Sequence, residues 1–399
     1  MFYLIDKLIS ISFISKFNTE NVTDISSMFE GCKSLKSINL SNLNFKNVID
    51  MTCLFCFSSS LKSVDLSNLN TKNLKVMDSM FSNCELLTFI NFTNFKTNNV
   101  AKMESLFQDC TIIKSIDLSS FDTQNVETMK GMFYGCYKLR SINLSSFNTT
   151  KVKDMSFMFY DCLSLTSLNL SSFNTINVNK MNSMFLLSES LISLDLSSFD
   201  TRNVDDMSNM FNSLHSLKYL NVSSFKTNKV QNMGRMFIDL PYLTSLDVSN
   251  FDTSNVVNMG QMFAYCSSLK TIDVSNFDTR NVTNMDSMFF YCSSLTEIDV
   301  SHFNTSNVGN MNAMFAHCKS LREIDLSNFD TRRLGVYDLM LGECSSLHRI
   351  DISTFFISYN RVIISGLLND KGVVIVNVYS EDNIKEQVPE NWIVLVKPN

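Results

Sequence analysis

The apolar positions of the chain recur with a fixed period of 26 residues. Each copy opens on Phe or Leu, and no insertion or deletion breaks the step between Phe17 and Thr354. The thirteen opening residues are Phe17, Leu43, Leu69, Phe95, Phe121, Phe147, Phe173, Phe199, Phe225, Phe251, Phe277, Phe303 and Phe329. A fixed period of this length predicts a solenoid, in which each repeat contacts only its neighbours.

The first half of each repeat has apolar residues at helical spacing. In the copy that opens at Phe121, they are Val126, Met129, Met132, Phe133 and Cys136. Steps of 3, 3, 1 and 3 residues predict a short helix with one buried face. Asn125 precedes this segment as a candidate N-cap, and Thr123 is expected to fix the entry turn.

The second half of the repeat alternates. Leu139, Ile142 and Leu144 are apolar, whereas Ser141 and Asn143 are polar and must face the other way. Consecutive strands in one orientation pair in parallel and are joined by right-handed crossovers. The sequence therefore predicts an α/β solenoid, a right-handed superhelix of thirteen repeats with a parallel β-ribbon on one face and short helices on the other.

The repeat resembles a known family. Its strand segment, LxxIxLSxF, is similar to the leucine-rich-repeat pattern LxxLxLxxN, with Phe147 at the place of the Asn or Cys. The fuller motif, FxTxNVxxMxxMFxxCxxLxxIDLS, resembles the BspA-like leucine-rich-repeat surface proteins, above all their 26-residue mycoplasma-type repeats. This resemblance covers Phe17 to about Thr354. It implies a leucine-rich-repeat fold, surface display, cell adhesion and host interaction, and it supplies no catalytic residue.

The segments outside the array are expected to cap it. Residues 1–16 read as a degenerate repeat with a worn strand at Ile11–Ser15, residues 17–354 form the solenoid, and residues 355–399 form a C-terminal cap. Asp6 and Lys7 interrupt the apolar opening, which is neither a convincing signal peptide nor long enough to span a bilayer.

The C-terminal cap has its own expected elements. These are a β-rich run at Val373–Val378, a helix from Ser380 to about Gln387, and a final strand at Ile393–Val396. Trp392, the only tryptophan, is expected to anchor the cap. No stop-transfer segment follows it.

The charge of the chain limits the kinds of partner that it is expected to bind. The net charge is −6 and the pI about 5.3, with no basic tract. Nucleic-acid binding needs clustered Lys and Arg, so this composition argues against it.

The sulfur-containing residues are predicted to fill the core. Of the 23 methionines, 22 occupy the Met129 and Met132 positions, where core packing is a better interpretation than a Cu(I) pathway. Nine cysteines share one repeat position, namely Cys32, Cys84, Cys110, Cys136, Cys162, Cys266, Cys292, Cys318 and Cys344. They are predicted to be buried free thiols, although disulfides between adjacent repeats are feasible, which leaves the redox compartment open.

Other chemistry is weakly indicated. Cys53 and Cys56 form the one CxxC, without the two further ligands of a zinc site or the βαβ context of a thioredoxin-like redox pair. The four histidines occupy four different repeat positions, so they do not converge on one metal or nucleophile. They are His215, His302, His317 and His348. We expect no enzyme, no cofactor and no metal.

The outward strand face holds the candidate site. The Asn143 position is Asp or Asn in all thirteen copies, and five consecutive copies from Asp247 onward have Asp. The candidate partner-binding residues are Asp247, Asp273, Asp299, Asp325, Asp351, Glu297, Glu323 and Arg349. Like charges on adjacent strands repel, so either a partner offsets them or Lys270, Arg322 and solvent screen them.

These observations predict a non-enzymatic protein-binding repeat protein. The leading hypothesis is a secreted or cell-surface adhesin or surface-interaction protein that binds host or neighbouring-cell proteins. The alternative is a cytoplasmic protein–protein interaction scaffold of the same fold, which the missing signal peptide favours.

Overall fold

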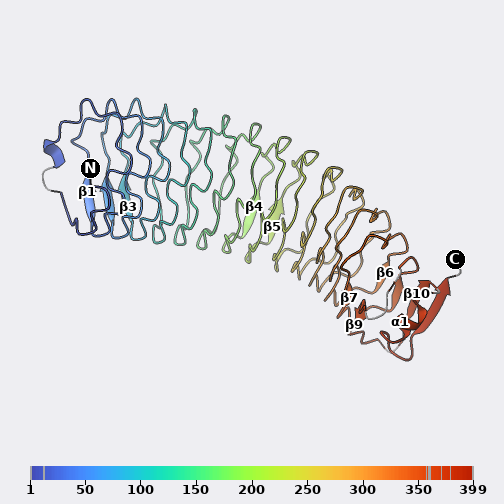
Figure 1. The fold of residues 1–399 in the computed structure, drawn as a ribbon. Coiled ribbons are helices and arrows are strands. Elements are labelled where there is room, and N and C mark those ends of the chain that lie inside the picture. The colour runs from blue at the N-terminus through green and yellow to red at the C-terminus, as the bar shows by residue number, and fades with distance from the viewer. Residues whose placement is uncertain are drawn as a thin grey trace. The chain divides into compact units, whose positions relative to one another are not determined.

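The computed structural model describes residues 2–11, 14–355, 357, 361–369, 371–377 and 379–397. The chain divides into two compact units, residues 1–203 and 204–399. Each unit is a parallel β-solenoid, and its turns, here called rungs, follow the thirteen 26-residue repeats (Figure 1). The right-handed sense of the superhelix and the cap boundaries stay predictions.

Short strands form at the predicted segment in seven of the thirteen repeats, whereas in the other six this segment forms no regular strand. The first unit contains β1 (Ser37–Asn39), β2 (Ser63–Asp65), β3 (Phe89–Asn91) and β4 (Ser193–Asp195). The second contains β5 (Tyr219–Asn221), β6 (Glu323–Asp325), β7 (Leu341–Gly342), β8 (Arg349–Asp351), β9 (Ile364–Ser365), β10 (Val373–Asn377) and β11 (Ile393–Lys397). Parallel sheets run in the orders β1-β2-β3 and β11-β10-β8-β6, and β7 pairs with β9. Between repeats the register step is 26 residues, as Ser37 opposite Ser63 shows.

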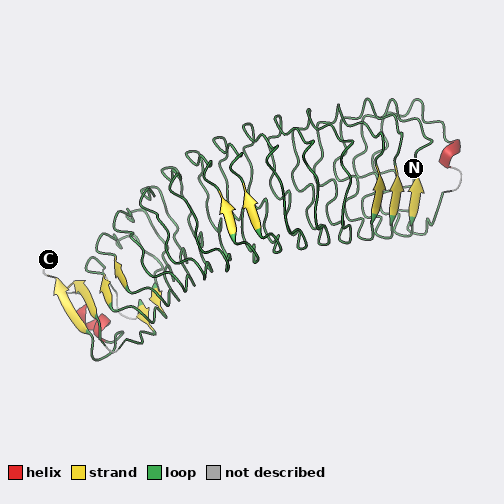
Figure 2. Cartoon of the chain, turned by 180° about the vertical axis from the view of Figure 1, so that it is seen from behind, coloured by secondary structure: helices red, strands yellow, loops and turns green. Residues whose placement is uncertain are grey.

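The predicted helical face is wrong. In the described part of the chain, helix is confined to the 3-10 turn η1 (Ile14–Lys16) and to α1 (Glu381–Lys385), near the two ends (Figure 2). Residues 129–136, with the helical apolar spacing, form consecutive tight turns instead.

The hydrogen bonds of these turns explain the difference. The amides of Met129, Gly131, Phe133 and Gly135 each donate to a carbonyl of the next rung, at 2.9–3.0 Å. The amides of Met132, Tyr134 and Cys136 donate within the rung to the third residue back, at 3.0–3.2 Å. An α-helix is about 10 Å across and satisfies its own amides, so helices cannot stack at a strand spacing of about 4.8 Å.

The turns need left-handed backbone at two places in each rung. In one rung these are Ser105 and Asp109, with φ of 52° and 55°. At the position of Asp109, directly before the ladder cysteine, other rungs have Asn83 or Gly135, residue types that tolerate positive φ. Six of the thirteen rungs have Gly, Asn or Asp at this position. The other seven have Phe57, Leu187, Ser213, Tyr265, Tyr291, His317 and Glu343. The sequence signal that distinguishes turns from a helix is therefore only partial.

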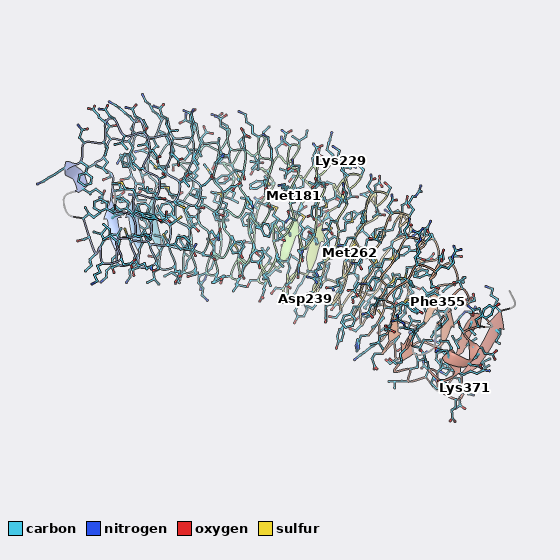
Figure 3. All side chains as sticks on the ribbon, viewed as in Figure 1. Met181, Lys229, Asp239, Met262, Phe355 and Lys371 are labelled. Carbon is cyan, nitrogen blue, oxygen red and sulfur yellow. The ribbon has the colours of Figure 1, made fainter. Side chains whose placement is uncertain are left out.

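The core prediction is confirmed. The methionines at the two ladder positions are completely buried apart from Met28, and Figure 3 labels Met181 and Met262 among the side chains. Phenylalanine rings stack from rung to rung, with 5.5 Å between the centroids of Phe29 and Phe55. The nine ladder cysteines are buried. The Sγ of Cys110 donates to the Phe81 carbonyl of the preceding rung at 3.3 Å.

The polar residues before the turns join rungs rather than cap helices. Asn125 is not an N-cap: its Nδ2 donates to the Asn98 carbonyl of the preceding rung at 2.8 Å. Thr123 does more than fix its own turn, because its Oγ1 donates to the Asn148 carbonyl at 3.0 Å and accepts from the Asn148 amide at 2.8 Å. The equivalent asparagine amide donates likewise at Asn47, Asn73, Asn99, Asn177, Asn203, Asn255, Asn281 and Asn307.

The chain ends continue the solenoid hydrogen bonding. The Phe2 amide donates to Met28 at 2.9 Å, and the Phe2 ring stacks on Phe29. The N-terminal strand predicted at Ile11–Ser15 is wrong in its described part, because Ile14 and Ser15 belong to the 3-10 turn η1. Ser12 and Phe13 lie outside the described residues, as does Val378.

The C-terminal segment has the predicted elements. β10, α1 and β11 all form, and β10 pairs with β8 of the last rung. Trp392 is buried: its Nε1 donates to the Asn369 carbonyl at 3.0 Å, and a Cβ on Gly372 would collide with its ring.

The threonine ladder predicts a stability effect. Thr149 is 1% exposed, and its hydroxyl donates to the Asn174 carbonyl and accepts from the Asn174 amide. Thr149→Val leaves both groups without a partner, so we expect the free energy of unfolding to fall by about 1–3 kcal/mol in urea denaturation. Thr149→Ser keeps the hydroxyl and serves as the control. A valine variant as stable as the wild type would contradict the role assigned to this hydroxyl.

Candidate functional site

The predicted site residues lie on the outward strand face of the second unit. Asp247, Asp273, Asp299 and Asp325 are exposed and Asp351 is half-buried. Glu297, Glu323 and Arg349 are also exposed. Alternation within each strand produces this placement: in β6, Ile324 is 3% exposed and points into the core between exposed Glu323 and Asp325.

Asp325 and Asp351 end β6 and β8, and the other three aspartates occupy the equivalent position in rungs that form no regular strand there. One carboxylate oxygen, Oδ1, accepts the backbone N–H of the serine two residues later, at 2.9–3.0 Å in all five rungs. The amide oxygen of Asn143 accepts from Ser145 in the same way, at 3.1 Å. An acceptor is therefore required at this position, which explains why it is always Asp or Asn, but a charge is not.

The serine contacts hold three of these carboxyls in the charged form. For Asp247, Asp273 and Asp299, the hydroxyl and then the amide of the following serine lower the pKa. All three carboxylates stay ionised at neutral pH, because hydrogen bonds to the charged form favour it.

A depression of about 540 Å³ gathers most of the predicted residues. It is lined by five carboxylates, Glu297, Asp299, Glu323, Asp325 and Asp351, and by two arginines, Arg322 and Arg349. Asp247 and Asp273 stand on earlier rungs and do not line it. The predicted residues therefore fall into two groups. One group lines the depression, whose net charge is −3 from five negative and two positive groups, and the other, Asp247 and Asp273, forms an acidic surface on the earlier rungs.

The register of the strands sets the neighbours within the depression. Glu323 pairs with Arg349, and Asp325 pairs with Asp351. His348 Nε2 also lies 3.4 Å from Glu323 Oε1. Opposite charges on neighbouring strands attract and like charges repel, so Asp325 beside Asp351 is an unfavourable pair that a bound cation would relieve.

Residues outside the predicted binding set also line the depression. Arg322 was assigned to screening, yet it lines the depression, as does Thr296. Residues two apart in a strand share a face, so the strand period groups Arg322 with buried Ile324 and not with Glu323 and Asp325. Arg322 precedes Glu323 and belongs to the strand edge rather than to the alternating face, so the period alone did not include it.

The arrangement suits binding of positive charge. Among the described residues, no three His, Cys, Asp or Glu side chains are placed to hold a metal ion. In the same part of the chain, none of the helices has the length and apolar character needed to cross a membrane. The histidines stay apart: His215 Nε2 is 2.7 Å from Asp239, whereas His302 Nε2 is 2.9 Å from the Val274 carbonyl.

Comparison with known proteins identifies a repeat family. The sequence pattern of the family described as "Mycoplasma protein of unknown function, DUF285" matches residues 1–115, 87–192, 163–265 and 241–355. No curated protein gives a significant match.

Several solved leucine-rich-repeat structures are similar at low identity. An internalin, InlF, from Listeria monocytogenes is 12% identical, covering 91% of this chain and 93% of its own, with a TM-score of 0.25. The pneumococcal vaccine antigen PcpA is 12% identical over 94% and 85% of the two chains, with a TM-score of 0.32. A leucine-rich-repeat protein from Eubacterium ventriosum is 13% identical over 70% and 83%, with a TM-score of 0.33.

The hydrogen bonding of Asp299 predicts how substitutions change stability. Asp299→Asn keeps the acceptor for Ser301, so its free energy of unfolding should stay within about 0.5 kcal/mol of the wild type at pH 7. Asp299→Ala removes the acceptor and should cost roughly 0.5–1 kcal/mol, the low end for a hydrogen bond because solvent competes.

The stability that Asp299 contributes changes with pH in a definite direction. The pKa of folded Asp299 lies below its usual value of 3.8, so its stabilisation is present above that value and is lost as the pH falls through the folded pKa. Asn does not titrate, so Asp299→Asn should gain stability relative to the wild type below about pH 4. Denaturant titrations at several pH values measure this. A constant difference across the acid range would contradict the assigned bond.

Proposed function

The chain belongs to the DUF285 family of mycoplasma proteins, and on this premise we propose that it is a non-enzymatic protein-binding repeat protein. Its partner is a protein with an exposed basic segment, which docks on the acidic strand face of the second unit. The observation that carries this proposal is the depression that gathers five carboxylates and two arginines on one face.

The rigidity of the strand face supports binding. Every acidic side chain of the ladder stands beside a buried apolar residue, and each aspartate is held by its serine through Oδ1. The second oxygen, Oδ2, stays available to a ligand. Because these carboxylates are already ordered, a basic partner meets several of them with little loss of conformational entropy.

The local hydrogen bonding does not explain why these rungs have Asp, which is charged, where Asn would serve. Asn serves the strand end equally well in the rungs of Asn143 and Asn169, yet the five rungs from Asp247 to Asp351 all have Asp. Placing like charges on adjacent strands is unfavourable. A cationic partner offsets that repulsion, and the charge also accelerates association.

The biological setting follows from the repeat motif. We infer a cell-surface or secreted protein that acts in adhesion or host interaction, because the repeat resembles those of BspA-like surface proteins. The intracellular scaffold is the competing hypothesis, and the two differ in whether intact cells expose the chain.

Binding to the acidic strand face is tested with a labelled Lys- and Arg-rich peptide as the probe. The triple variant Asp273→Asn, Asp299→Asn, Asp325→Asn should raise the dissociation constant by roughly 3- to 100-fold, since each exposed charge contributes about 0.2–1 kcal/mol. Affinity of the wild type should fall as salt rises.

The matched control alters charge elsewhere. Lys130→Glu with Arg235→Glu changes residues in the tight-turn segments and should leave peptide affinity unchanged or slightly higher. If the triple variant binds as well as the wild type while the control fails, the acidic strand face is only solvated surface. Circular dichroism and urea denaturation confirm that both variants fold.

Localisation is tested by protease treatment of intact cells. For a surface protein, we expect peptides from loops and exposed strands to be released before lysis. If peptides of this chain are recovered only after lysis, while a surface marker protein is released before lysis, the intracellular scaffold is supported and the adhesin hypothesis is rejected.

A further inference from the structure

Cys53 and Cys56 occupy the two ends of one tight turn. The Cys56 amide donates to the Cys53 carbonyl at 3.1 Å, which closes a turn of four residues. Such a turn holds its first and last Cα atoms within about 7 Å, and a disulfide spans Cα atoms about 4.4–6.8 Å apart. The backbone therefore already brings these two residues to disulfide distance.

The two thiols have different environments. Cys53 is the one cysteine of eleven, all of which the structure describes, that is not buried. Cys56 is 1% exposed, and its Sγ donates to the Ser79 carbonyl at 2.9 Å. The next ladder cysteine along the chain, Cys84, is fully buried and donates to the Phe55 carbonyl at 3.1 Å.

The electrostatics of the pair are asymmetric. The Cys56 thiol hydrogen bond lowers the pKa of Cys53, against smaller opposing effects of burial and of the carboxylates Glu30, Asp78 and Asp50. The same contact with Cys53, followed by burial, raises the pKa of Cys56. The partly exposed sulfur is thus the better nucleophile, and Cys56 is placed to resolve because it lies beside Cys53 in the same turn.

We propose that Cys53 and Cys56 form a thiol–disulfide exchange site that small disulfides oxidise to an intramolecular disulfide. The Cys53 thiolate attacks one sulfur of R–S–S–R, whose S–S bond breaks, and the leaving thiolate takes a proton from water. Cys56 then gives its proton to solvent, and its sulfur attacks the Cys53 sulfur and expels the second R–S⁻. Two protein thiols are oxidised to one disulfide, and the small disulfide is reduced to two thiols.

The neighbouring rungs supply matched serine variants. The residues equivalent to Cys53 are Ser79 and Ser105 in the next two rungs, and the residue equivalent to Cys56 is Ser82, which is buried. Cys53→Ser and Cys56→Ser therefore repeat side chains that the fold already accommodates. Urea denaturation of the reduced proteins should give the same midpoint for both variants and the wild type.

The experiment exposes the native full-length chain to oxidised glutathione, followed by acid quenching, alkylation and tryptic mass spectrometry. Cys53 and Cys56 fall in one tryptic peptide, Asn47–Lys62, which contains no other cysteine, and Cys84 falls in Val76–Lys96. We expect the first peptide to lose two hydrogens and the second to stay reduced. Cys56→Ser should stop at one glutathione on Cys53, and Cys53→Ser should leave Cys56 reduced.

Three results would overturn the proposal. They are a native wild type that stays reduced while the denatured chain is oxidised, a Cys56–Cys84 crosslink in place of the predicted one, and a glutathione adduct on Cys56 in Cys53→Ser. A kinetic readout adds a further check: in the native reduced chain, Cys53 should be alkylated at least about tenfold faster than Cys84. Equal alkylation rates would show that the partly exposed thiol is not the entry point.

Discussion

The hydrogen bonding between neighbouring rungs is the constraint on which the rest of the structure depends. Neighbouring rungs are hydrogen-bonded along the turn segments as well as along the strands, so both sides of a rung are held at about the 4.8 Å strand spacing and each segment must be as thin as a single extended chain. This condition excludes helices and leaves turns that alternate bonds within a rung and to the next one, as from Met129 to Cys136. It also explains the ladders of Thr123 and Asn125, because the side chains supply bonds where the backbone bends away.

Much of the fold was predictable because the repeat period fixes what each residue meets. Any residue lies beside its equivalent 26 positions on, so burial of Met129 implied burial of Met155 and Met181. The alternation around Ile142 gave the inward and outward faces, although strands form at this segment in seven of the thirteen repeats and not in this one. The helix was wrong because consecutive tight turns produce the same apolar spacing as a one-sided helix. The position before the cysteine separates the two only in part, because it holds Gly135 or Asn83 in some rungs but Tyr265 or Tyr291 in others.

The candidate site was predictable as a list of residues but not as an arrangement. The strand period correctly indicated that Asp299, Glu297 and Arg349 face outward, since that needs only the pleat. It did not reveal that Oδ1 of each aspartate accepts from a serine amide, because Asp and Asn serve equally there. Nor did it separate the depression from Asp247 and Asp273, which depends on how side chains of adjacent strands fill space.

The side-chain ladders have a consequence for how such a chain changes length over generations. Thr149 bonds forward to the next rung, whereas Cys136 and Asn125 bond backward to the preceding one. Most junctions therefore offer the same donors and acceptors as the junction before them, with exceptions such as Leu214, Lys151 and Phe45. Unequal recombination within the gene, which adds or removes whole 26-residue blocks, creates a seam chemically equivalent to the existing ones. The number of repeats can then change while the outward-facing residues of each block diverge. The binding surface and the repeat scaffold therefore evolve almost independently of each other.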